Sequence, residues 1–407
     1  MNASTLRGRS YGLDARSGRL LWSFGVRARR VGRLAARCHR LGNPLRANSD
    51  ILIASQNEVV LRLALIALLA LALPSAASAY TWPFKPFNQQ HPIRGFFGDP
   101  RTVFENGVLA GGFDGPGVFS FHQGIDIAAP NGTPVYPVMS GTAHYLGASV
   151  LNVAVGQVNG VDVTFQYFHL TPIVGEGQHV IAKETVLGYV EPPYGHVHLT
   201  EIDGSNAVNP LLKGHLAPYV DRTRPVIRMT TFSNSAGAIE TPLGLCGRVQ
   251  IAVDAYDRPP MAVPGAFNGL PVTPTLVEWT VHRLNGKVAI PLRVAADFRT
   301  ALPPNAKFSD TYAKGTYENS PRFGPQQYTS MPGRYLFQLA PNFDTTTLPN
   351  GVYSLTVRVA DIRNNAATQT QRFSVLNAKG NVCPGSLSEP PGTPPPPTEP
   401  PAGSGGA

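Results

Sequence analysis

From Tyr80 onward the chain consists of short runs in which apolar and polar residues alternate, and Gly or Pro separates one run from the next. The clearest runs cover 134–139, 152–158 and 161–168. Successive side chains of a β-strand point to opposite faces of the sheet, so this alternation is typical of strands that bury one face. The 41 Gly and 39 Pro residues favour turns over long helices. We therefore predict an all-β fold of antiparallel sheets, with a first domain at 80–218.

A second β domain is predicted after a connector at 218–225. Strand candidates follow at 226–231, 248–255, 275–282, 334–339, 353–359 and 368–375. Short strands at this spacing, separated by Gly, Pro and Asn, predict a β-sandwich over 222–380. The stretch 348–361 resembles the penultimate strands of bacterial immunoglobulin-like or fibronectin-type modules, so we expect an immunoglobulin-like sandwich. Since such a module needs only about 100 residues, we also expect an insertion, with 303–331 as the candidate, or a second small subdomain.

The net charge of +9 lies in the first 79 residues, which hold twelve Arg, no Lys and three acidic residues. The remainder is neutral, so the charge gives no reason to expect nucleic acid as a partner. The same segment contains an apolar run, 63–73, which follows Arg62 and precedes small residues ending at Ala79. This pattern predicts a signal peptide at 59–79, with contact to a membrane only during export. A membrane anchor is the alternative, but the run is shorter than the roughly 20 residues that span a bilayer.

Residues 1–58 form an Arg-rich leader that is unusually long for a signal peptide, and the leader contains no Met after Met1. A non-ATG start near Val59 or Val60 would give an ordinary signal peptide. Our hypothesis is that 1–58 is an artefact of the gene model.

Removal of the signal peptide takes Cys38 with it and leaves two cysteines, Cys246 and Cys383. An even pair in an oxidising compartment predicts one disulfide that closes the second domain, with two free thiols as the alternative. Residues 384–407 are dominated by Pro, Gly, Ser, Thr and Glu and lack the apolar residues that a core requires. We expect a disordered, Pro-rich tail there.

Five residues in the first domain have side chains suited to metal binding and proton transfer. His196 and His198 are two apart, which places both imidazoles on one face of a strand. His122 and Asp126 are four apart around Gly124, in a segment that favours a strand or loop over a helix. His169 ends a strand candidate. Each of these has an alternative reading as a packing, surface or turn residue.

Together the three segments resemble, in order and approximate spacing, the His-x-Gly-x-Asp, Tyr-x-His-Leu and His-x-His motifs of the lysostaphin/LytM-like zinc endopeptidases of bacterial cell walls. The resemblance covers roughly 91–213, and it includes an opening strand at 91–101, a Gly-Gln-x-Val turn at 177–180 and a closing Asn-Pro at 209–210. Two positions depart from the family pattern. Lys183 stands where Gly is usual, and Glu201 follows the His pair one residue later than is common.

The resemblance implies an antiparallel β-sheet domain of the duplicated hybrid motif type and a single zinc ion. His122, Asp126 and His198 would be the zinc ligands, and three protein ligands with an open fourth position are typical of a catalytic site. His169 and His196 would transfer protons, since the ordinary pKa of histidine lies near neutrality. The donor atoms suit zinc, although composition alone leaves other divalent ions open.

We therefore expect an exported zinc endopeptidase, periplasmic or extracellular, that hydrolyses peptide cross-links of peptidoglycan. One alternative is a non-catalytic LytM-like regulator or peptidoglycan-binding module, and another is an adhesion or scaffold protein that acts through its C-terminal domain. The bond that is cleaved and the partner of the C-terminal domain stay open at this point. No site role is expected for the remaining histidines of the exported part, His91, His144, His179, His215 and His282.

Overall fold

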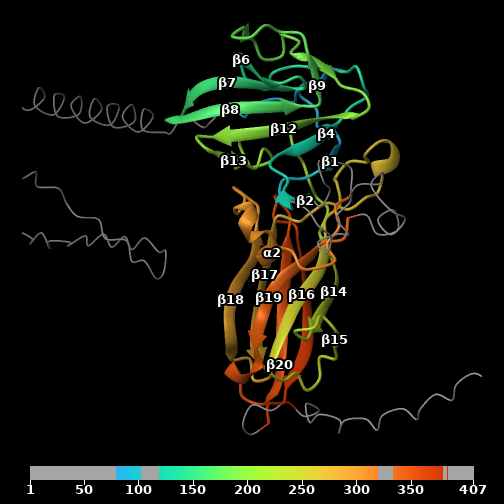
Figure 1. The fold of residues 1–407 in the computed structure, drawn as a ribbon, viewed down its shortest axis with the longest axis vertical. Helices are drawn as coiled ribbons and strands as arrows, with labels where there is room; N and C mark the ends of the chain where they lie inside the picture. The colour runs from blue at the N-terminus through green and yellow to red at the C-terminus, as the bar shows by residue number, and fades with distance from the viewer. Residues whose placement is uncertain (1–78, 102–118, 320–332, 379–382, 384–407) are drawn as a thin grey trace, which may run out of the picture. The chain divides into compact units, whose positions relative to one another are not determined.

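The computed structural model describes residues 79–101, 119–319, 333–378 and 383 (Figure 1). The predicted leader at 1–58, the signal peptide up to Ser78 and the tail at 384–407 lie outside these residues. Within the described ranges, no helix is long and apolar enough to cross a membrane. The expectation of an all-β chain is confirmed, because almost every element is a strand and all paired strands run antiparallel.

The first domain is built on one large sheet with the order β1-β4-β12-β8-β7-β6-β10, and β13 pairs with β12. Its strands are β1 (Ile93–Gly95), β4 (Ile125–Ala128), β6 (Gly141–Gly147), β7 (Val150–Val158), β8 (Val161–Phe168), β10 (His179–Val180), β12 (His196–Asp203) and β13 (Asn206–Val208). A three-stranded sheet contains β5 (Pro134–Val135), β11 (Gly188–Val190) and β9 (Leu170–Pro172), and β2 (Pro100–Arg101) pairs with β3 (Ser120–Phe121).

The alternating pattern of β8 places every second side chain in the core. Val163, Phe165 and Tyr167 are buried, and the Tyr167 hydroxyl accepts a hydrogen bond from the Val138 backbone at 2.9 Å. The strand predicted at 134–139 ends already at Val135. Pro137 lies inside that run and has no backbone N–H to donate to a ladder, which accounts for the shorter strand.

The second domain contains two four-stranded sheets, with the orders β15-β14-β16-β19 and β18-β17-β20-β21 (Figure 1). The strands are β14 (Val226–Ser233), β15 (Ile239–Glu240), β16 (Arg248–Tyr256), β17 (Leu276–Arg283), β18 (Val288–Asp297), β19 (Leu336–Asp344), β20 (Gly351–Ala360) and β21 (Ala366–Val375). All six strand candidates coincide with one of these strands. The immunoglobulin-like topology is consistent with this arrangement and stays a prediction.

Sequence analysis missed β18. This strand lies at the edge of its sheet, most of its side chains are exposed, and it contains Pro291. An exposed edge strand has no apolar alternation to reveal it, and an edge is where a sheet tolerates proline.

The two β domains belong to one compact unit, Ser75–Ala407. The described part of the candidate insertion at 303–331 holds the short helices η3 (Asn305–Lys307) and α2 (Phe308–Thr311). Phe308 and Tyr312 pack against Phe121 of the first domain, with ring centroids 5.2 and 5.9 Å from it. The Tyr312 hydroxyl donates to the Gly98 carbonyl at 2.7 Å. These contacts attach the insertion to the first domain.

The local structure is ordinary at the two positions that depart from the family pattern. Lys183 has a φ of 67°, the left-handed conformation that Gly adopts without strain, so the turn is retained with a lysine in it. Glu201 is buried, and its carboxylate accepts hydrogen bonds from the Tyr80 hydroxyl and from Nδ1 of His215. Neither side chain lines the cavity described below.

The predicted disulfide between Cys246 and Cys383 is present and closes a loop with a sequence separation of 137. Replacing Cys246 by Ser should lower the free energy of unfolding by about 2–5 kcal/mol, because the unfolded chain regains the entropy that the closed loop removes. Urea titration under oxidising conditions measures this. Cys383→Ser and the double variant should lose the same amount as Cys246→Ser, and a larger loss in the double variant would contradict a single shared bond.

Candidate active site

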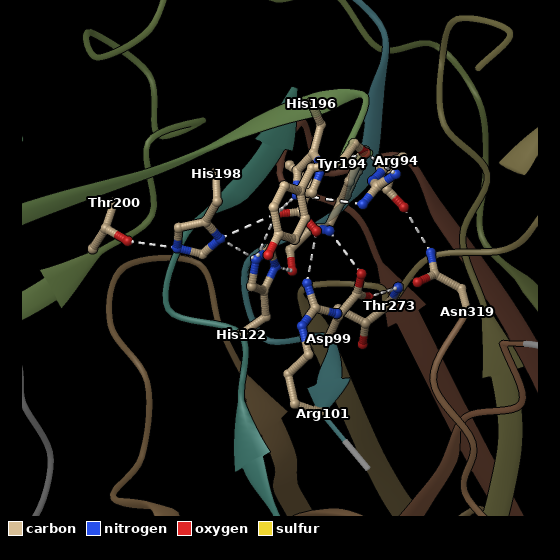
Figure 2. Close-up of polar contacts among 12 residues, drawn as sticks. Arg94, Asp99, Arg101, His122, Tyr194, His196, His198, Thr200, Thr273 and Asn319 are labelled. Atoms are coloured by element: carbon tan, nitrogen blue, oxygen red, sulfur yellow. Dashed lines mark hydrogen bonds and ion pairs between the residues drawn. The ribbon is translucent and has the colours of Figure 1, made fainter. Parts of the chain in front are cut away.

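The pairing of β4 with β12 places Asp126 directly opposite His198. Directly opposed residues of an antiparallel pair project to the same face, so the carboxylate and the imidazole meet. His196 is two residues earlier on β12 (Figure 2), and it lines one cavity together with Asp126 and His198. The strand predicted from the spacing of the two histidines is therefore present.

His122 reaches the same point from the turn that precedes β4. Its backbone N–H donates to the Asp99 carbonyl at 2.8 Å, and its carbonyl accepts from the Gly98 N–H at 2.9 Å. Gly124 allows the close approach of this turn to β12, because a Cβ there would lie 2.3 Å from the Leu199 carbonyl oxygen. Steric crowding against β12 thus explains why a glycine occupies this position of the His-x-Gly-x-Asp motif.

Three donor atoms converge in front of the sheet: His122 Nε2, Asp126 Oδ1 and His198 Nδ1. The two nitrogens are 2.7 Å apart and lie 3.1 and 3.0 Å from the carboxylate oxygen. The Phe96 carbonyl accepts from His122 Nδ1 at 2.8 Å, so His122 Nε2 presents a lone pair. His198 Nε2 donates to the Thr200 hydroxyl at 2.8 Å, so His198 Nδ1 also presents a lone pair. Lone pairs gathered this closely fit a metal cation, and two nitrogens with one oxygen suit zinc.

Arg101 and Gly95 orient the Asp126 carboxylate. Arg101 donates to Asp126 Oδ2 at 2.8 Å, which leaves Oδ1 directed at the histidines. Gly95 allows this arrangement, since a Cβ there would lie 2.5 Å from Oδ2. Burial alone would raise the pKa of Asp126, but His122, His196 and Arg101 outweigh it and hold that pKa well below the ordinary value. The carboxylate is therefore ionised.

The buried imidazoles of the site are neutral. Burial lowers the pKa of His122 and of His196 to about 3, and Arg101 and Arg94 respectively contribute to that decrease. Burial also lowers the pKa of His169 to about 4. Near neutral pH these rings keep a lone pair that can bind a metal or accept a proton.

His169 and His196 lie side by side next to the three donor atoms, with ring centroids 4.6 Å apart. His169 has a φ of 63° between β8 and β9, an uncommon backbone conformation for a residue other than Gly. Its ring stacks on Tyr194 at 4.0 Å. His196 Nδ1 donates to the Tyr194 carbonyl at 2.9 Å, and its Nε2 accepts from Arg94 at 3.3 Å.

All five sequence-predicted residues line one cavity of about 410 Å³. The second domain contributes Phe267, Glu318 and Asn319 to the same cavity. Asn319 donates to the Arg94 carbonyl at 2.7 Å, and the Arg94 guanidinium lies 4.2 Å from the centre of the Phe267 ring. An adjacent cavity of about 800 Å³ shares Arg94 and Phe267 with the first.

Sequence reasoning missed Arg94, Arg101 and Tyr194. The two arginines lie in the stretch 91–101, which was recognised only as an opening strand, and Tyr194 directly precedes the Gly-His-Val-His segment. Arg101 is 25 residues from Asp126, so the sequence carried no local signal that the two would pair. The remaining described histidines lie outside the 410 Å³ cavity, and His144, for example, pairs with exposed Glu176 at 2.7 Å.

Asp99 connects the His122 turn to the second domain. Its Oδ2 accepts from the Phe96 N–H and its Oδ1 from the Thr273 N–H, both at 2.7 Å. Burial raises the pKa of Asp99 to about 7, although Arg101 and the two backbone donors oppose that rise. The geometry of the site therefore depends on a residue from beyond the first domain.

Residues 120–210, which include all five site residues, match the model of Peptidase family M23. Among solved structures the chain is similar to LytU, with 24% identity over 30% of this chain and 84% of that one and a TM-score of 0.22. It is also similar to a mutant catalytic domain of the prophage-encoded M23 protein EnpA from Enterococcus faecalis, with 23% identity, coverage of 29% and 92%, and a TM-score of 0.20. A third similar structure is the deep-sea M23 metalloprotease pseudoalterin, with 15% identity, coverage of 41% and 92%, and a TM-score of 0.22. No curated protein matches the chain.

Gly95→Ala should weaken zinc binding about 10- to 100-fold, because the new methyl group would displace the Asp126 carboxylate from Arg101. Competition against a chromophoric chelator measures the affinity. Gly147→Ala is the matched control, since a Cβ at Gly147 meets no atom within 4 Å. Equal zinc affinity in the two variants would show that the position of the carboxylate is not set by this contact.

Proposed function

We propose that the chain, whose residues 120–210 match the model of Peptidase family M23, is an exported zinc-dependent endopeptidase that hydrolyses peptide cross-links of bacterial peptidoglycan. One observation carries the proposal. Two imidazole lone pairs and one carboxylate oxygen lie within 3.1 Å of one another, beside two further neutral imidazoles. This arrangement supplies both a metal site and groups for proton transfer.

In this proposal His122, Asp126 and His198 hold the zinc ion, which when bound lowers the pKa of water and polarises the carbonyl of the peptide bond. Arg101 occupies Asp126 Oδ2, so Oδ1 is the oxygen that would be available to the ion. Hydrogen bonds from His122 Nδ1 to Phe96 and from His198 Nε2 to Thr200 fix the tautomers that expose the ligand atoms.

In this proposal His169 and His196 carry out the proton transfers. The attacking water must lose a proton, and the leaving amine must gain one. Arg94 donates to His196 Nε2, so proton uptake at His196 requires the guanidinium to move. We therefore assign proton removal from water to His169. Once substrate has displaced Arg94, this proton passes to Nε2 of the neighbouring His196, which delivers it to the leaving amine.

The two adjoining cavities are the proposed substrate groove. The larger cavity has mainly apolar walls, and Arg94 and Tyr194 lie where it meets the catalytic cavity. A guanidinium at this point can bind a carboxylate, and peptidoglycan stem peptides carry carboxylates. Phe267 and Asn319 supply the wall from the second domain.

His198→Ala should lose both bound zinc and activity. His169→Ala and His196→Ala should keep zinc and lose about 10²- to 10⁴-fold in rate, because only proton transfer is removed. Zinc is measured by elemental analysis of the purified protein, and activity by the release of new amino groups from purified sacculi, with the products identified by mass spectrometry.

The matched control for these variants is His144→Ala, an exposed histidine outside the cavity that should leave both readouts unchanged. Full activity in His196→Ala and in His198→Ala would overturn the proposal. A zinc-loaded wild-type protein that binds sacculi but releases no amino groups would favour a non-catalytic regulator or binding module instead.

Export is proposed from the apolar run at 63–73 and its flanking residues, and it would place the enzyme in the periplasm or outside the cell. N-terminal sequencing of the exported protein should begin at Tyr80. Peptides from 8–50 recovered by mass spectrometry from expressed protein would contradict the hypothesis that 1–58 is a gene-model artefact.

A further inference from the structure

A second group of carboxylates lies apart from the catalytic cavity. Asp221, Asp257 and Asp361 each offer an oxygen, and these oxygens lie within 4.8 Å of one another. All three residues are buried, with exposed fractions of 6%, 1% and 2%. Asp221 lies in the predicted connector, Asp257 follows β16, and Asp361 follows β20, so the group joins the connector to one strand of each sheet.

One oxygen of this group has no hydrogen-bond partner among the residues that the structure describes. Asp257 Oδ1 accepts from the Arg258 N–H at 2.8 Å, whereas Asp257 Oδ2 is buried and accepts no hydrogen bond. An unsatisfied buried carboxylate oxygen is costly, and a native structure normally provides a partner for it. Burial, together with the charges of Asp221 and Asp361, raises the pKa of Asp257 well above its ordinary value.

The other two carboxylates are held by hydrogen bonds to both of their oxygens. Asp221 accepts from the Tyr219 hydroxyl at 3.1 Å and from the Thr223 N–H at 2.9 Å. Asp361 accepts from the Asn365 side-chain amide at 2.6 Å and from the Arg363 N–H at 2.8 Å. These hydrogen bonds fix the orientation of the two carboxylates. Metal-binding carboxylates are commonly oriented by hydrogen bonds from surrounding groups in this way.

No side-chain cation among the described residues forms an ion pair with the group. The Arg363 guanidinium donates instead to the carbonyls of Leu211 and Tyr219, at 2.7 and 3.3 Å. Arg258 donates its backbone N–H to Asp257, whereas its side chain donates to the Tyr256 hydroxyl at 3.3 Å. Within the described part of the chain the three buried carboxylates therefore have no ion-pair partner, although the more distant guanidinium charges of Arg258 and Arg363 act on them.

We propose that Asp221, Asp257 and Asp361 form a calcium site that fixes the connector to the ends of both sheets of the second domain. Ligands that are all oxygen favour a hard cation over zinc. Calcium–oxygen bonds of about 2.3–2.6 Å allow oxygens on one ion to lie up to about 5 Å apart, which matches this group. Backbone carbonyls and water would complete the coordination. This site is independent of the catalytic proposal.

The test uses the full chain, freed of metal on a chelating resin and titrated with CaCl₂. Thermal unfolding of the wild-type protein should shift upward by about 5 °C when calcium exceeds its Kd a hundredfold. Tb³⁺, a luminescent calcium substitute, should show emission sensitised by Tyr219, whose hydroxyl donates to Asp221. Added calcium should displace that emission.

Asp257→Asn should abolish the calcium-dependent shift while leaving the metal-free protein at least as stable as wild type, because the variant removes a buried charge. Asp297→Asn is the matched control, since Asp297 is an exposed aspartate paired with Arg299, and it should keep the wild-type shift. His198→Ala should also keep the shift, which separates this site from the catalytic one. A wild-type protein that responds to neither ion, or an Asp257→Asn variant that responds as wild type does, would overturn the proposal.

Discussion

The register between β4 and β12 is the constraint on which the catalytic arrangement depends. Side chains alternate along a strand, so a slip of one residue would turn Asp126 away from His198 and destroy the donor set. The register is supported from both sides. Ile125 and Leu199 pair in the same ladder and are fully buried, and Gly124 leaves room for the Leu199 carbonyl. The apolar core thus holds the two polar residues opposite each other.

Burial gives the site its charge distribution. The same desolvation that keeps His122, His169 and His196 neutral would also favour a protonated Asp126, yet the pKa of Asp126 stays well below its ordinary value and the ion pair with Arg101 favours the charged carboxylate. A divalent ion held by one carboxylate and two imidazole nitrogens would keep a net positive charge. Such a charge is what polarisation of a carbonyl requires.

The sequence predicted those features that depend on local pattern. Strand alternation identified β8 and six strands of the second domain, and the spacing of His196 and His198 predicted a shared face, because these relations follow from the repeat of two residues along a strand. Sequence reasoning did not find Phe267 or Asn319, since their place at the cavity results from packing between segments that are far apart in the chain. The exposed edge strand β18 carried no local signal, and the group formed by Asp221, Asp257 and Asp361 required the ends of three separate segments to meet.

The aromatic contact between Phe121, Phe298, Phe308 and Tyr312 has a consequence for how the chain can be divided. Phe121 lies immediately before the first ligand of the catalytic motif and is buried largely by rings from the second domain. A fragment ending near residue 218 would leave this ring in water, together with the Gly98 carbonyl that Tyr312 binds. The first domain therefore depends on the second domain to bury part of its core. Recombination that exchanged the second domain would have to bring a matching aromatic surface, so we expect the two domains to be inherited as a pair.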